Sequence, residues 1–365
     1  MTRWRQTAVV IAVIGCVWAP AAMGGGGEVF GIDAWRKEVA RLGLNPTAVV
    51  YPFTTSPEMT EWAHAAIADS SGLSDQHRLD RLQQAMFDPE NFDFAYDADQ
   101  TLAAKGAFDA RRGNCMSFTG LFVALSRGLG IQTFLMTVEK SPDIARDGSL
   151  VVINRHVVAG YRQGRAVSIF DFYLASEAPY VGGRVIDDVM ASALFHTNLG
   201  GKALRDGDPD LALGHLEIAT TLAPDWAPGW VNLGVTLARL GETDGAFSSY
   251  RRVLEIDPTN SSAYTNLSSL YRSLGREQEA EVALRAAART TESPFTLIAM
   301  ADSEALGGDL RQASRYLKRA KRRYPREPEV FEGLARLARS AGHHRREEKC
   351  LAKAEKLRQA SAADE

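Results

Sequence analysis

A period of about 34 residues in the second half of this chain constrains its fold more than any other feature. Four alanines recur at spacings of 34, 34 and 33 residues: Ala212, Ala246, Ala280 and Ala313. Glycines recur in the same register: Gly207, Gly241, Gly275, Gly308 and Gly342. A unit of this length holds one pair of short helices, which cannot bury an apolar face alone and must stack on its neighbours. The period therefore predicts an all-α solenoid.

The best-marked unit resembles the tetratricopeptide repeat in sequence. It reads, in order, Trp230, Asn232, Leu233, Gly234, Ala246, Tyr250 and Pro258. In repeats of this kind the small alanine lets two helices approach closely, and the first helix of each pair lines a concave groove. The resemblance implies about five repeats over residues 193–357, a tail at 358–365 and a protein partner in the groove. Candidate groove residues are Thr265, Arg272 and Asp302.

Residues 1–27 are interpreted as an export signal followed by a glycine spacer, and not as part of the fold. Arg3 and Arg5 precede a short apolar run at residues 8–15, which is too short to span a bilayer on its own. Cleavage at residues 19–21 is one interpretation, acylation of Cys16 in a lipoprotein is a second, and a retained anchor is a third. Each predicts an exported protein of the periplasm or cell envelope, which the second would anchor to a membrane through Cys16.

Composition limits the kinds of partner and cofactor. The 365 residues suffice for two domains or so, and the apolar content of 45% is ordinary for a globular protein. A net charge of -3 argues against nucleic acid as the main partner. The sequence has no Cys-x-x-Cys pair, and the adjacent His343 and His344 cannot share one helix face as metal ligands should. Neither a metal nor another cofactor is expected.

The stretch from Arg111 to Ile131 begins as a polar turn and becomes an apolar helix. Its apolar residues repeat at helical spacing, as Phe118, Leu121, Phe122, Leu125 and Leu129. One face of the helix should therefore be buried. Cys115 falls in the first turn, where unpaired N–H groups and the positive end of the helix dipole favour a thiolate. A nucleophile is one interpretation of Cys115, and a small buried side chain that packs the helix start is the other.

Two later segments supply partners for such a thiol. Residues 133–138 are predicted to form a strand, and residues 150–158 a second strand that holds His156. A third strand is predicted at residues 166–174 and holds Asp171. A thiol nucleophile needs a base to accept its proton, and the imidazole needs an acceptor that fixes its tautomer. The order of cysteine, histidine and aspartate therefore favours the nucleophile.

These residues resemble the transglutaminase-like cysteine superfamily, and more closely its bacterial members that are fused to tetratricopeptide repeats. The resemblance is carried by Gly113-Asn114-Cys115, Arg155-His156-Val157 and Phe170-Asp171-Phe172. It implies an α+β papain/transglutaminase-like domain over residues 28–190, with a catalytic triad of Cys115, His156 and Asp171. The sequence departs from the superfamily after the histidine, where a tryptophan often follows. This chain has Val157, Val158 and Ala159 there.

Two functions from different classes are consistent with the sequence. In the first, Cys115 attacks an amide bond of a peptide or protein substrate, and the acyl group passes to water or to an amine. The backbone N–H of Cys115, with Asn114 as a further donor, would hold the oxyanion. In the second, the protein is a non-enzymatic envelope scaffold that binds a protein partner through its repeats. The intact triad favours the first.

Overall fold

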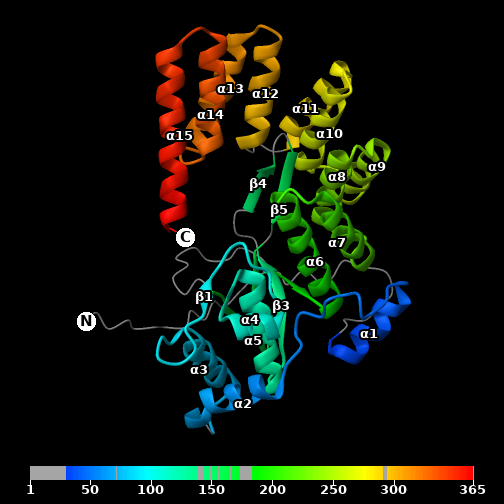
Figure 1. Ribbon diagram of the computed structural model, residues 1–365, viewed down its shortest axis with the longest axis vertical. Coiled ribbons are helices and arrows are strands. Elements are labelled where there is room, and N and C mark those ends of the chain that lie inside the picture. The colour runs from blue at the N-terminus through cyan, green and yellow to red at the C-terminus, as the bar shows by residue number, and fades with distance from the viewer. Residues whose placement is uncertain are drawn as a thin grey trace, which may run out of the picture. The chain divides into compact units, whose positions relative to one another are not determined.

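The structure, a computed structural model, describes residues 30–70, 72–138, 143–147, 150–154, 156–164, 166–172, 183–290 and 294–364. The expected leader at residues 1–27, with Cys16, lies outside these ranges. In the described part of the chain, no helix is both long enough and apolar enough to cross a membrane. The chain forms two compact units, and helices make up most of both (Figure 1). The units are Met1–Asp143 with Ile153–Gly229, and Ile144–Val152 with Trp230–Glu365.

The region before the cysteine stretch is mainly helical. Its helices are α1 (Ile32–Arg41), α2 (Pro57–Ala66), the short 3-10 helix η1 (Ala68–Ser70), α3 (Asp75–Phe87) and α4 (Ala104–Ala110). Ser56 caps α2 by accepting a hydrogen bond from the Met59 N–H at 3.3 Å. Pro57 takes the first helical position, where a missing N–H loses no helical hydrogen bond. Local sequence therefore sets where α2 begins.

The larger sheet of the first unit has its strands in the order β7-β6-β3-β8, and neighbouring strands are antiparallel. These strands are β3 (Thr133–Val138), β6 (Val157–Gln163), β7 (Ala166–Phe170) and β8 (Gly183–Ile186). Two short strand pairs accompany this sheet. β1 (Ala95–Tyr96) runs parallel to β2 (Arg112–Gly113), and β4 (Asp143–Asp147) pairs with β5 (Leu150–Asn154).

The strand ends differ from the sequence prediction at the two positions that matter most. The strand predicted at residues 150–158 is divided, because β5 pairs with β4 whereas β6 pairs with β3 and β7. The chain changes sheets between Asn154 and Val157, so His156 lies between two strands and not within one. The strand predicted at residues 166–174 ends at Phe170, so Asp171 directly follows it.

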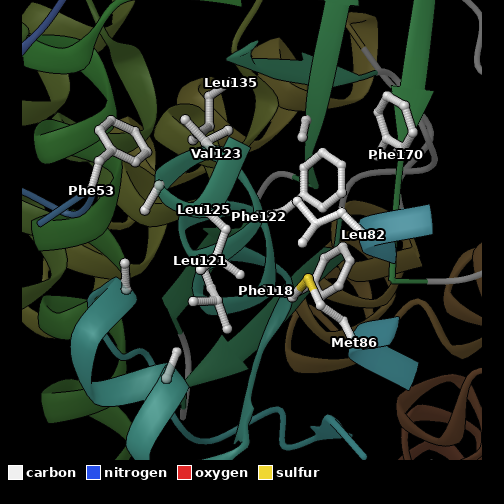
Figure 2. Close-up of a cluster of buried hydrophobic side chains, with 14 of the residues drawn as sticks. Phe53, Leu82, Met86, Phe118, Leu121, Phe122, Val123, Leu125, Leu135 and Phe170 are labelled. Atoms are coloured by element: carbon white, nitrogen blue, oxygen red, sulfur yellow. The ribbon is translucent and has the colours of Figure 1, made fainter. Parts of the chain in front are cut away.

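Helix α5 (Cys115–Gly128) forms the centre of the core of the first unit. The sequence predicts one buried face, but each residue from Met116 to Ser126 is buried. Phe122 stacks on Phe170 of β7 with ring centroids 4.8 Å apart, and on Phe118 one turn earlier in α5 (Figure 2). Removing a large aromatic ring from such a core typically costs about 3–5 kcal/mol. These rings therefore anchor α5 to the sheet.

The remainder of the chain is a series of helix pairs, as the period predicts. They are α6 (Asp188–Arg205) with α7 (Pro209–Leu222), α8 (Ala227–Leu240) with α9 (Thr243–Ile256), α10 (Ser261–Ser273) with α11 (Glu277–Thr290), α12 (Pro294–Leu306) with α13 (Leu310–Arg323), and α14 (Pro328–Ser340) with α15 (His344–Asp364). The repeated glycines lie between the two helices of each pair and have φ between 71° and 87°. That left-handed conformation explains why glycine recurs with the period.

The first helix pair belongs to the first compact unit, because a buried carboxylate ties the start of α6 to it. Asp188 is 1% exposed and accepts hydrogen bonds from both terminal nitrogens of Arg127, at 2.8 and 2.9 Å. The same carboxylate accepts the Tyr51 hydroxyl and the Gly31 N–H, both at 2.8 Å. A buried charge needs such a set of donors. The domain boundary predicted at residues 190–193 thus falls within α6.

Close packing within the repeats depends on glycine as well as on alanine. A Cβ added at Gly234 of α8 would lie 2.5 Å from the ring of Tyr250, which is fully buried in α9. Gly214 of α7 offers a contrast, because it is exposed and a Cβ added there would meet nothing within 4 Å. The two helical glycines therefore differ in packing and not in backbone conformation.

We expect Gly234→Ala to lower the free energy of unfolding by about 1–3 kcal/mol, because the ring of Tyr250 must move. The matched substitution Gly214→Ala should raise it by about 0.5–1 kcal/mol, because alanine favours the helix over glycine. Chemical denaturation followed by circular dichroism measures both changes. A stabilising effect of Gly234→Ala would contradict the close contact with Tyr250.

Candidate active site

A network of hydrogen bonds around Asn114 fixes the start of α5. Asn114 is the N-cap: its Oδ1 accepts the Ser117 N–H at 3.1 Å, and its Nδ2 donates to Thr101 Oγ1 at 2.7 Å. The Ser117 hydroxyl accepts the Leu102 N–H at 2.7 Å and lies 3.1 Å from the Gln100 carbonyl oxygen, to which it donates. The first turn of the helix is therefore held firmly against the loop that precedes it.

Cys115 is the first residue of α5, where the sequence places it. Its side chain is half-buried and its thiol is free of any disulfide. The N–H groups of a first helical turn have no partner within the helix, and the helix dipole favours negative charge there. A Cβ added at Gly113 would lie 2.4 Å from the Cβ of Ser117, so the turn that presents Cys115 requires glycine.

His156 and Asp171 meet at one end of the sheet. His156 Nε2 lies 2.9 Å from Asp171 Oδ2, and the two side chains are only 15% and 7% exposed. Strands β6 and β7 run antiparallel, with Ala159 opposite Phe170. The residue just before β6 and the residue just after β7 therefore lie at the same end of this strand pair. This register brings the histidine and the aspartate together.

The imidazole of His156 contacts the thiol as well as the carboxylate. Asp171 shares a hydrogen bond with the ring, and the side chain of Cys115 lies close enough to the ring to raise the pKa of His156. Since Nε2 is engaged by Asp171, Nδ1 is the ring nitrogen that is left for the thiol. The structure thus brings the three residues of the predicted triad together, with the imidazole in the middle.

The charge state of His156 follows from these contacts. Burial of the ring by itself lowers the pKa of His156. The hydrogen bonds with Asp171 and Cys115, together with the charges of those groups, outweigh burial and raise the pKa of His156 from its ordinary 6.5 to about 9. With a pKa of about 9 the imidazole of His156 is protonated at neutral pH.

Two further residues, to which the sequence assigned no role of their own, hold the aspartate in position. Gln83 of α3 donates from Nε2 to the main-chain carbonyl of Asp171 at 2.9 Å. Phe172, the next residue, packs among four aromatic rings, those of Phe87, Phe94, Tyr96 and Phe118. Phe172 belongs to the Phe-Asp-Phe motif and could have been singled out. Gln83 lies 88 residues before Asp171, and its sequence surroundings carry no comparable signal.

The side chain of Asn114, the weaker oxyanion candidate, is held at the start of α5. Asn114 Oδ1 accepts the Ser117 N–H and Nδ2 donates one hydrogen to Thr101, so an oxyanion role would fall to the second hydrogen of Nδ2. The backbone N–H of Cys115 keeps its place in the first helical turn. Among the described residues, no group of three or more histidine, cysteine, aspartate or glutamate side chains could hold a metal ion.

Comparison with known families identifies the repeats. Two family models match the chain, both described as tetratricopeptide repeat, at residues 198–261 and 249–282. A search of curated proteins finds no match. The C-terminal half of the chain therefore carries tetratricopeptide repeats, which are protein-interaction modules. These matches cover the repeats only, so the transglutaminase-like resemblance of the first domain stays a prediction.

Solved structures with some similarity include a tetratricopeptide repeat protein and a pilus biogenesis factor. A thermophilic tetratricopeptide repeat protein of Thermus thermophilus, TTC0263, is 24% identical, and the match covers 47% of this chain and 97% of that one with a TM-score of 0.41. PilW, described as a type IV pilus biogenesis factor, is 23% identical over 46% of this chain and 78% of its own, with a TM-score of 0.39. Because these scores are low, the assignment rests on the family models and on the period.

The raised pKa of His156 makes the stability of the protein depend on pH. A group whose pKa rises on folding adds stability below its unfolded pKa and loses it as the pH rises through its folded pKa. We expect Asp171→Asn to destabilise the protein most at pH values up to about 6.5, and progressively less as the pH rises from there to about 9. Denaturation curves across this range measure the effect. Asp69→Asn, at an exposed carboxylate, is the control and should show no such trend; a penalty for Asp171→Asn that is constant with pH would refute the coupling.

Proposed function

We propose that this protein is an interaction scaffold of the cell envelope whose first domain also carries a cysteine-dependent activity on amide bonds. The family matches support the scaffold more directly than the enzyme, because they cover the repeats and not the triad. The enzyme rests on the contacts among Cys115, His156 and Asp171. The envelope location follows from the export signal expected at residues 1–27. The two parts are tested separately.

The scaffold proposal follows from the way the repeats stack. Asp302 of α12 accepts two hydrogen bonds from Arg336 of α14, at 3.2 and 2.8 Å, across one period of 34 residues. These two helices are the first members of consecutive pairs. In tetratricopeptide arrays such helices line the concave surface, so a partner would meet side chains of α12 and not those of α11. Thr265, also a candidate groove residue, is buried and its hydroxyl bonds within its own helix.

A photo-crosslinking amino acid tests which helices meet the partner. Placed at Ser303 of α12, it should capture a defined partner protein. At Val282 of α11, which is 70% exposed, it should capture none of it. The same partner should be captured in a Cys115→Ala background, because binding through the repeats does not need the thiol. Equal capture from both positions would contradict the groove.

The enzyme proposal follows from the charge state of the triad. An imidazolium at His156 next to Cys115 at a helix start favours the thiolate, which is the nucleophilic form. Asp171 fixes the ring and stabilises its positive charge. The thiolate attacks an amide carbonyl, and the His156 proton passes to the leaving amine as the thioester forms. The Cys115 N–H is suited to bind the oxyanion.

The second half of the reaction decides the class of enzyme. Neutral His156 then accepts a proton from an attacking group, which breaks the thioester and restores the thiolate. Attack by water gives hydrolysis of a peptide or protein amide, and attack by an amine gives transfer of the acyl group. We propose hydrolysis, because water is present at high concentration in any compartment and the transfer reaction needs a second bound substrate.

Alkylation by iodoacetamide at about pH 6 tests the thiolate, because only the thiolate reacts appreciably. Cys350 is an internal control, since it is also a free and half-buried thiol. We expect Cys115 to react more than about 10-fold faster than Cys350, and His156→Ala to remove most of the difference. Mass spectrometry of the two cysteine peptides measures the rates. Equal alkylation rates of Cys115 and Cys350 in the unmodified protein would contradict the enzyme proposal but not the scaffold proposal.

A further inference from the structure

Helix α13 carries a charge pattern that sets it apart from the equivalent helices of the other repeats. Its sequence, Leu310–Arg323, contains seven lysines and arginines and no acidic residue. The corresponding helices before it are balanced or acidic: α7 has two acidic residues and no lysine or arginine, α9 has two of each sign, and α11 has three acidic residues and two arginines. The charge of α13 is therefore not a general property of the solvent face of this solenoid.

Four of these side chains form one line along the helix. They occur at spacings of four, three and four residues, and we call them the basic stripe: Arg311, Arg315, Lys318 and Arg322. All four are exposed, and in the described structure none of them takes part in an ion pair. At 1.5 Å per residue the stripe runs for about 16 Å. It is a continuous row of unneutralised positive charge.

The stripe faces away from the packed side of the helix. The buried residues of α13 are Ala313, Leu317 and Ala320, which lie on the helix face opposite the stripe. That apolar face packs against α12 and α14, between which α13 is seen in Figure 1. The stripe itself includes no apolar or aromatic side chain, so its surface offers charge alone.

Local helix energetics do not favour this arrangement. Like charges four residues apart repel, as at Arg311 with Arg315 and at Lys318 with Arg322. Arg311 also lies in the first turn, where the positive end of the helix dipole disfavours a cation. Basic residues in the last turn suit the dipole, which accounts for Lys321 and Arg323 but not for the first half of the stripe. Binding of an external anion would offset the repulsion between the basic side chains of the stripe.

We propose that the basic stripe docks the protein on the surface of an anionic phospholipid bilayer. Specific protein interfaces usually centre on buried aromatic or aliphatic anchors, which the stripe lacks. A bilayer surface requires only positive charge within a Debye length, and each lysine or arginine adds to the attraction. A lipid surface is therefore the partner that a row of charge without anchors fits best.

Vesicle co-sedimentation of the full chain tests the proposal. The probes are vesicles of phosphatidylcholine alone and vesicles with about 30 mol % phosphatidylglycerol, at about 0.1 M salt. The difference in binding between the two kinds of vesicle measures the part that depends on anionic lipid. Insertion of the expected apolar leader into a neutral bilayer would contribute to both and therefore cancels. We expect binding to the anionic vesicles to exceed that to the neutral ones, and to fall as the salt concentration rises.

A charge-matched pair of variants assigns the effect to the stripe. The stripe variant replaces its four residues together, as Arg311→Gln, Arg315→Gln, Lys318→Gln and Arg322→Gln. The control replaces four exposed basic residues of α15, which has acidic residues among its basic ones, as Arg345→Gln, Arg346→Gln, Lys349→Gln and Lys353→Gln. The stripe variant should lose anionic binding by up to about 1,000-fold and the control by much less. Both should keep their helical circular dichroism, because glutamine favours helix and the replaced side chains are exposed.

Three outcomes would overturn the proposal. The first is equal binding of the unmodified chain to neutral and anionic vesicles. The second is equal loss in the stripe variant and the α15 control, which would reduce the effect to total charge. The third is stripe-dependent binding of polyglutamate or of an oligonucleotide in place of the anionic vesicles, which would assign the stripe to an acidic polypeptide or to nucleic acid.

Discussion

Burial of α5 on all sides is the constraint on which the first unit depends. A helix whose residues from Met116 to Ser126 are all buried cannot leave the N–H groups of its first turn to water. Asn114 and Ser117 satisfy part of that demand through bonds to each other and to the preceding loop. Cys115 is the first residue of this turn, beside the N–H groups that those bonds do not satisfy. The core thus creates a place for negative charge at the point where the thiol lies.

The sheet supplies the other half of the site by its register. Because β6 and β7 are antiparallel, the residues next to their paired ends meet whatever their distance in sequence. His156 and Asp171 lie outside the regular strands, so their side chains are free of the alternation that the sheet imposes. Phe172 and Gln83 then hold the aspartate from two other directions. The pairing of β6 with β7 and the packing around Asp171 together place a carboxylate beside the imidazole of His156.

Features encoded locally could be predicted from the sequence, and features set by distant pairing could not. The helical repeats follow from a period, and the helix start at Cys115 follows from a polar turn before an apolar run. The three candidate triad residues could be chosen because a cysteine at a helix start is followed in the sequence by a histidine and then an aspartate. The strand break at His156 was missed because it depends on β5 pairing with β4, which no local pattern reveals. The role of Gln83 was missed because its partner lies 88 residues away.

The carboxylate of Asp188 gives the repeat array two kinds of unfolding behaviour. Helix pairs of a solenoid can open one after another from a free end, since each contacts only its neighbours. The pair α6 and α7 cannot follow that rule, because opening it would leave Arg127 of α5 as an unpaired and largely buried charge. Fraying from the last repeat should therefore halt before this pair. The first repeat and the triad are expected to melt together as one cooperative element.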